Sequence, residues 1–294
     1  MKKLNAAALL AALFIASPVA AEEPTLDLSG VNPEAGSIEA FSDVSLDDLE
    51  TVAVQPIAFT TTATRRETEV MFSSLSSAEG PDADVAAIFE GVDFSVSAPE
   101  KAEGDEGLDF AGSSTKTDTD ALTLGFGLGT LPLMQLQSAD AYQKTLANFE
   151  GLGDLFDVMF SPKVGAATRA FLATSKAGKF DVDAYTAMLA SATLGMASSD
   201  DPSVQRRHGY LLVGLWMGYS ILSAATDSLN ESTAQIGDSL IILLVKDAAY
   251  GSSDKRIAAV VKSVTDDIKG GKATASSLMG QAQKMLAVKA DDAK

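Results

Sequence analysis

A run of eighteen residues without a charged side chain, 209–226, constrains the fold of this chain more than any other feature. The run holds the single tryptophan, Trp216, within an almost unbroken apolar stretch from Leu211 to Leu222. A helix that is apolar on all sides must be buried on all sides, either inside a protein or inside a membrane.

Burial inside the protein is the interpretation that the flanking residues favour. Glycine and hydroxyl side chains dilute the hydropathy of the run. If the chain is exported, Arg206 and Arg207 would lie outside a membrane, against the positive-inside tendency. The next apolar run, 240–245, is too short to cross back. We therefore expect a central bundle helix, and a membrane-inserting helical hairpin over 209–245 is the alternative.

Apolar residues recur at helical spacing through residues 138–290. From Tyr185 and again from Ile257 they fall at offsets 0, 3, 4, 7 and 11, on one face of a helix. Helix starts are expected at Ser161-Pro162, Asp181, Asp201-Pro202, Glu231 and Asp254, and breaks or ends at Gly151, Gly153 and Gly270-Gly271. The pattern predicts a mainly α fold with a C-terminal bundle of about six helices.

The N-terminal half has a different composition. Residues 22–137 carry 23 acidic and 4 basic side chains, whereas 138–294 carry 17 and 16. Low hydropathy with high net charge does not offset the ~1–2 kcal/mol per residue needed to order a backbone. We expect residues 22–120 to be an acidic, partly disordered region. Short helices are possible near 45–49 and 85–89, and short strands at 52–54 and 92–96.

This charge and the lack of cysteine exclude several kinds of function. An acidic surface repels phosphate backbones, so nucleic acid is not an expected partner and a cationic partner fits better. Because the chain has no cysteine, it has no lipoprotein anchor, disulfide, thiol nucleophile or thiolate metal site.

One short stretch resembles a known family. Ser45-Leu-Asp-Asp-Leu, followed by Thr62-Ala-Thr-Arg-Arg-Glu, is similar to the segment that leads into the plug of outer-membrane receptors coupled to the TonB system. The resemblance covers some twenty residues of common types. The alternating strands that follow such a plug do not appear later in this sequence, so the resemblance transfers no function.

The segment 121–137 is apolar and rich in glycine, with Gly125, Gly127 and Gly129 at alternate positions. A phosphate-binding loop would end in Gly-Lys-Ser/Thr, and a dinucleotide fingerprint would need glycine where Thr130 stands. The spacing therefore predicts an apolar connector whose glycines let backbones pack closely, and no phosphate site.

The only histidine, His208, follows Arg206 and Arg207. A zinc site or a catalytic triad would have to be built on this one ring, and zinc sites usually draw on several His or Cys ligands. The triplet could bind an anion such as a carboxylate. A solvated helix face is the more common role of such a cluster, and we expect that role here.

Close pairs of acids offer the remaining route to catalysis. The pairs are Asp118 with Asp120, Asp181 with Asp183, and Asp200 with Asp201. None supplies the further ligands of a calcium loop. Two carboxylates can hydrolyse glycosides only when they are held about 5–10 Å apart across a cleft. Most of these acids stand at expected helix starts, where capping explains them.

These observations predict a non-enzymatic periplasmic or secreted binding or scaffold protein that contacts another envelope component. No catalytic residue, cofactor or metal is expected, and no ligand-binding residue is identified. A carboxylate-dependent hydrolase of the envelope and the membrane-inserting hairpin are the alternatives.

The first 21 residues predict export. Lys2 and Lys3 precede an apolar run, which Ser17-Pro18 interrupts before Val19-Ala20-Ala21, the small residues that signal peptidase needs. We expect the mature chain to begin at Glu22. The intact mass of protein taken from its native compartment tests this, and a mass that still includes residues 1–21 would contradict it.

Overall fold

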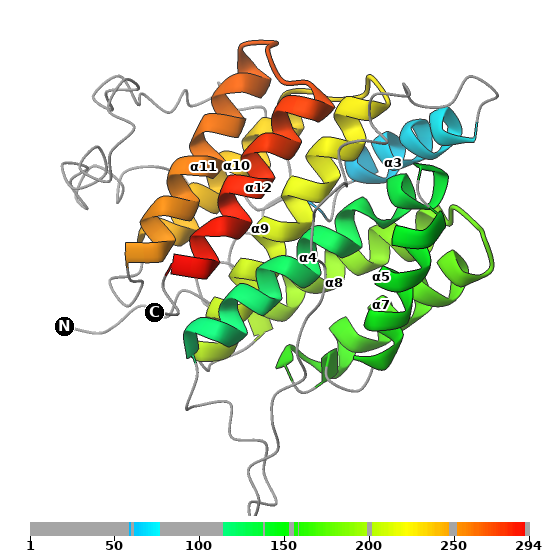
Figure 1. Cartoon of the computed structure of the whole chain (residues 1–294), viewed down its shortest axis with the longest axis horizontal. Coiled ribbons are helices and arrows are strands. Elements are labelled where there is room, and N and C mark those ends of the chain that lie inside the picture. Colours follow the sequence, from blue (N-terminus) through cyan, green and yellow to red (C-terminus); the bar gives the residue numbers. More distant parts are fainter. Residues whose placement is uncertain are drawn as a thin grey trace, which may run out of the picture.

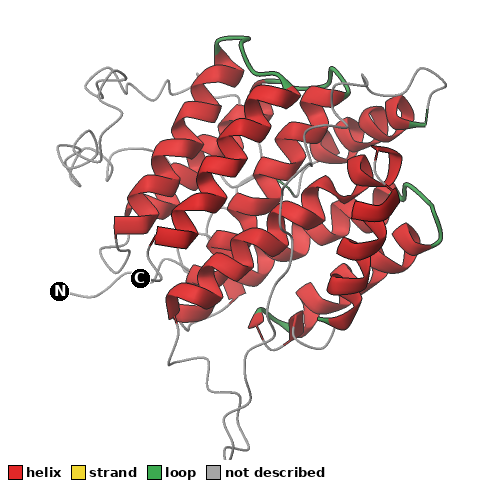
Figure 2. Cartoon of the chain, in the orientation of Figure 1, coloured by secondary structure: helices red, strands yellow, loops and turns green. Residues whose placement is uncertain are grey.

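The structure is a computed structural model that describes residue 59 and residues 62–76, 114–137, 139–152, 156–157, 159–198, 202–246 and 252–291. Within these ranges the chain forms nine helices and no strand (Figures 1 and 2). The mainly α fold and the helical bundle are confirmed. The helices are α3 (Thr62–Leu75), α4 (Ser114–Gln137), α5 (Ala139–Gly151), α7 (Pro162–Lys176), α8 (Val182–Ser198), α9 (Pro202–Ala225), α10 (Glu231–Lys246), α11 (Ser252–Lys269) and α12 (Ala275–Asp291).

Two helices, α4 and α9, occupy the centre of the bundle (Figure 1). Every residue of α4 from 120 to 134 is buried, and so is every residue of α9 from 207 to 223. The uncharged run 209–226 therefore forms most of a helix that is buried on all sides, as its composition predicts. Of the helices described, none is both long enough and apolar enough to span a membrane.

Glycines bring α4 and α9 together along their length. A Cβ atom on Gly214 of α9 would lie 2.2 Å from the carbonyl oxygen of Leu122 of α4. Further along both helices, a Cβ on Gly218 would lie 2.8 Å from the Cα of Gly129. Both contacts advance in the same chain direction, so the two helices run parallel. Their backbones touch at distances that no larger residue permits.

The other helices cover this central pair. On one side α8 packs against α9, α5 packs against α4, and α7 fills the space between α5 and α8. On the other side α10 and α12 pack against α9, and α11 packs against both of these helices. The short helix α3 lies against α8 (Figure 1).

Local sequence signals set several of the helix ends. The Ser161 hydroxyl accepts from the Val164 amide ahead of Pro162, and the Asp181 carboxylate accepts from the Ala184 amide 2.9 Å away. Both caps match the sequence expectation. Gly271 has a φ of 63° after the last turn of α11, which is the left-handed conformation that commonly ends a helix at glycine.

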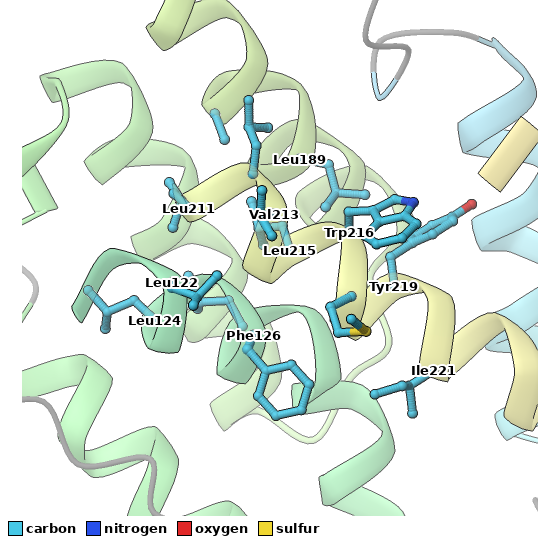
Figure 3. Packing of buried hydrophobic residues seen from close by; sticks show 14 of the residues in the cluster. Leu122, Leu124, Phe126, Leu189, Leu211, Val213, Leu215, Trp216, Tyr219 and Ile221 are labelled. Carbon is cyan, nitrogen blue, oxygen red and sulfur yellow. The ribbon is translucent and has the colours of Figure 1, made fainter. Parts of the chain in front are cut away.

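Trp216 lies in the core, where α9 packs against α10. Its side chain is fully buried, and its indole Nε1 donates to the Thr233 carbonyl oxygen at 2.8 Å. Figure 3 shows Trp216 and Tyr219 leaving α9 on the side away from α4. A Cβ on Gly237 of α10 would lie 2.6 Å from the indole ring, so α10 meets the ring without a side chain between them.

The structure corrects two sequence expectations. Residues 121–137, expected as a connector, belong to the central helix α4, although their glycines do provide the close packing that was expected. Helix α3 is a short helix of the kind expected within 22–120, at a position that was not predicted. Helix α11 begins at Ser252, so Asp254 lies within it and does not cap it. The elements expected at 45–49, 52–54, 85–89 and 92–96, and the leader 1–21, lie outside the described residues.

The close contact of α4 and α9 predicts the effect of a single methyl group. Gly214→Ala should lower the free energy of unfolding by about 1–3 kcal/mol, because the new Cβ must push two helix backbones apart. Denaturant unfolding, followed by the fluorescence of the single tryptophan, measures the change.

Gly280→Ala is the matched control, since nothing lies within 4 Å of a Cβ built on Gly280 of α12. It should leave stability unchanged or raise it by up to about 1 kcal/mol through helix propensity. Equal effects of the two substitutions would contradict the crossing described above.

Candidate functional site

The start of α9 holds Arg206, Arg207 and His208, the triplet that was expected on a solvated helix face, with an anion site as the alternative. His208 is fully buried, Arg207 is 7 % exposed, and Arg206 is half-buried. The expectation of a solvated helix face is therefore wrong for Arg207 and His208. The polar triplet turns inward here because α9 is covered on all sides from its second turn onward.

The imidazole of His208 is held between three elements. Its Nδ1–H donates to the Val204 carbonyl oxygen one turn earlier, at 2.8 Å. The edge of Phe160 meets the ring at a centroid distance of 5.4 Å. The other nitrogen, Nε2, faces Gly195 of α8, where a Cβ would lie only 2.5 Å away, and it has no hydrogen-bond partner in the part of the chain that the structure describes.

Burial keeps this ring neutral. The loss of solvation lowers the pKa of His208 below its ordinary value of 6.5, the Val204 carbonyl opposes this shift, and the charge of Arg207 adds to it. Beside His208 on α9, the guanidinium of Arg206 lies 5.8 Å from the centroid of the ring of Tyr210, one turn beyond it, within cation–π range. His208 stands out in the sequence as the only histidine, whereas nothing in the sequence relates Gly195 to it.

A second polar cluster, which was not expected from the sequence, gathers around Glu67 of α3. Tyr219 of α9 donates its hydroxyl to Glu67 Oε2 at 2.9 Å. Asn230 Nδ2 and the Ser232 hydroxyl donate to Glu67 Oε1 at 2.9 and 2.7 Å. Burial and the Glu67 carboxylate both raise the pKa of Tyr219, so its hydroxyl remains protonated and serves as a donor.

Asn230 has a further role at the same place. Its Oδ1 accepts from the Thr233 amide at 3.2 Å, so Asn230 caps the start of α10. The Asn230 side chain thus links Glu67 of α3 to the turn between α9 and α10. An Asn ahead of Glu231 and Thr233 is a capping signal that a sequence search could have found.

The acid pairs do not form a catalytic dyad in the described residues. Asp181 caps α8, and Asp183 pairs with Arg65 of α3. Asp120 is buried within α4. The side chain of Asp118 and both residues of the pair 200–201 lie outside the described part. No three His, Asp or Glu side chains of the described residues gather in a way that could hold a metal ion.

Tyr185 of α8 is a further buried side chain with a polar group. Its hydroxyl donates to the Gly129 carbonyl oxygen at 2.9 Å, and burial raises its pKa. Gly125 and Gly129, considered above for a phosphate loop, lie inside a helix and face α9. Around Glu67 and at Tyr185 the polar groups bond one helix to another, whereas His208 bonds a carbonyl oxygen of its own helix. The arrangement at Glu67 and Tyr185 supports the fixing of helices.

Comparison of the chain with family models, with curated proteins and with solved structures found no match.

The environment of His208 predicts how stability depends on pH. Because its pKa is lowered in the folded state, the unfolded chain binds a proton first as the pH falls. The stabilising effect of the neutral ring is complete above the ordinary histidine pKa and is lost as the pH falls through the folded-state value. Below pH 6.5 we expect the free energy of unfolding to fall with decreasing pH, by up to about 1.4 kcal/mol per pH unit, until the pH passes the folded-state pKa of His208.

His208→Leu is the matched control, because His208 is the only histidine in the chain. Unfolding titrations at several pH values should show a flatter dependence in this variant. An equal slope in the variant and the parent chain would show that another group is responsible.

Proposed function

We propose that this chain is an exported, non-enzymatic binding or scaffold protein of the bacterial envelope. Its helical bundle provides a rigid body that contacts another envelope protein. Its acidic N-terminal part serves as a soluble tether. The leader at residues 1–21 delivers it to the periplasm or beyond.

The observation that carries this proposal is the use of the polar side chains. Glu67 holds α3 to the turn before α10, Tyr185 holds α8 to α4, and Asp157 pairs with Arg169 of α7 at 3.0 Å. Acids, tyrosines and amides of the kind that enzymes use for acid–base chemistry are here bonded across helices. A rigid body of this kind suits the presentation of a surface to a partner.

The distribution of charge supports the tether. Residues 22–57 carry nine acidic side chains and no basic one, and residues 77–113 carry ten acidic and one basic. Each segment has a net charge of −9, so the two together equal the net charge of −18 of the whole chain, whereas 138–294 is nearly balanced. Such a block of like charge is typical of solvated interaction arms, and it favours a partner with a cationic surface.

In-cell crosslinking tests this function. A photo-reactive residue placed singly at Ala170, Ala187 or Gln283 samples the exposed faces of α7, α8 and α12. We expect one face to yield a defined envelope protein and the others to yield none, because a specific interface is local.

The control is the same set of positions in a chain that lacks residues 22–57. This deletion spares Phe59 and α3, which pack against the bundle. Crosslinks that survive it place the contact on the bundle. The absence of any defined product, together with turnover of a cell-wall fragment or leakage of liposomes by the purified chain, would overturn the proposal in favour of a hydrolase or a membrane-inserting protein.

A further inference from the structure

The last turn of α8 and the second turn of α9 are packed tightly together around the ring of His208. A Cβ built on Gly195 of α8 would lie 2.5 Å from His208 Nε2 and 2.9 Å from its Cδ2. The same Cβ would lie 3.0 Å from a methyl group of Val164 of α7, and the ring of Phe160 packs edge-on against the imidazole. We call this contact of Phe160, Val164, Gly195 and His208 the histidine seam. It leaves no room for a water molecule between the ring and α8.

The hydrogen bond of the ring determines which nitrogen takes up a proton. Nδ1 lies 2.8 Å from the Val204 carbonyl oxygen, which can only accept, so Nδ1 carries the hydrogen of the neutral ring and Nε2 carries the lone pair. Nε2 is buried in the histidine seam and has no hydrogen-bond partner in the described part of the chain. A proton added there creates a buried, charged donor without an acceptor, which is costly in free energy.

The charged groups around the histidine seam do not offset a positive ring. Arg207 is 7 % exposed, and its charge disfavours a second cation beside it. Helix α8 has no charged side chain from residue 184 to 198, and on the α7 side Asp157 is bonded to Arg169 at 3.0 Å. Burial lowers the pKa of His208, and the other groups that act on it are the Val204 carbonyl and Arg207. No carboxylate of the described residues therefore stabilises the charged ring.

The two helices of the histidine seam differ in their freedom to move apart. Helix α9 is held by α4, since a Cβ on Gly214 would lie 2.2 Å from the Leu122 carbonyl oxygen. The last turn of α8 lies at the surface, because Leu194 is 47 % exposed and the helix ends at Ser198. Terminal turns of helices open at a lower free energy than central ones. Movement of this turn is the shortest way for water to reach a charge on Nε2.

We propose that the histidine seam is an acid-operated latch, in which a proton on His208 Nε2 releases the last turn of α8 from α9 while α4, α9, α10, α11 and α12 stay folded. Release exposes the imidazole and the ring of Phe160 together. The bundle thereby gains a small aromatic surface in acid that it lacks at neutral pH. This device goes beyond the proposed binding function and does not depend on it.

Hydrogen exchange of the purified chain at about pH 7.5, 6.5 and 5.5 tests the latch, after correction for the intrinsic pH dependence of amide exchange. The opening constant of amides 190–195 should rise by up to about tenfold per pH unit below 6.5, because the open ring binds a proton that the closed ring excludes. In acid these amides should also exchange faster than those of α11 and with a smaller urea dependence, because little surface is exposed. No rise in acid, or equal rates and equal urea dependence in the two helices, would overturn the proposal.

His208→Gln removes the titration and keeps a neutral polar side chain. The opening of amides 190–195 should then change by less than about twofold over the same pH range. A rise that persists would belong to another group, such as Asp200 or Asp201, which lie outside the described residues, and would refute the latch.

Nuclear Overhauser contacts in the parent chain give a test that needs no variant. The ring of the single histidine can be followed through its titration, and its contacts with Gly195 should weaken as the ring becomes protonated. Contacts that persist on the protonated ring would contradict release.

Gly195→Ala provides the reverse experiment at neutral pH. The new methyl group enters the place now taken by the imidazole, so the opening constant of amides 190–195 should rise by about tenfold or more without acid. Gly280→Ala, which adds a methyl group where nothing lies within 4 Å, should leave the opening of these amides unchanged. Equal exchange of amides 190–195 in the two variants would show that the histidine seam is not closed as described.

Discussion

The contact between α4 and α9 is the constraint on which the rest of the structure depends. Gly125 and Gly129 of α4 face Gly214 and Gly218 of α9, and Cβ atoms at these positions would lie within 2.2–2.9 Å of backbone atoms of the other helix. Each glycine costs a helix roughly 1 kcal/mol relative to alanine. The close approach offsets this cost, since it brings two long apolar helices into contact along their lengths and buries large side chains such as Leu211 and Leu215. Because the two helices run parallel, the chain must return between them, and α5, α7 and α8 make that return.

Polar side chains then fix the outer helices to this pair. Tyr185, Trp216 and Tyr219 each combine a large buried ring with one hydrogen bond to another helix. A buried ring supplies most of the free energy, and the single polar atom specifies the register. His208 departs from this pattern, because its Nδ1 bonds its own helix and its Nε2 is buried against Gly195. Burial lowers the pKa of His208, so we expect acid to weaken the contact of α8 with α9.

The sequence predicted the elements whose signals are local and missed those that tertiary packing decides. The caps at Ser161 and Asp181, the end at Gly271 and the buried helix around Trp216 follow from residue type and spacing. Helix α4 could not be predicted in this way, because three glycines and Pro132 give it poor intrinsic helix propensity and only the presence of α9 makes it stable. Glu67 was missed for a related reason. Its three donors lie more than 150 residues away in sequence, and no periodicity links such distant positions.

The central claim is that α4 and α9 meet backbone to backbone, and a double-mutant cycle tests it most directly. Gly129→Ala and Gly218→Ala each introduce a methyl group at the same contact, where a Cβ on Gly218 would lie 2.8 Å from Gly129 Cα. Once the first methyl group has pushed the helices apart, the second methyl group clashes less with the opposite backbone and costs less unfolding free energy. The loss of unfolding free energy in the double variant should therefore be smaller than the sum of the two single losses by at least about 1 kcal/mol. Additive losses, within about 0.3–0.5 kcal/mol, would show that the two glycines do not share a contact and would contradict this architecture.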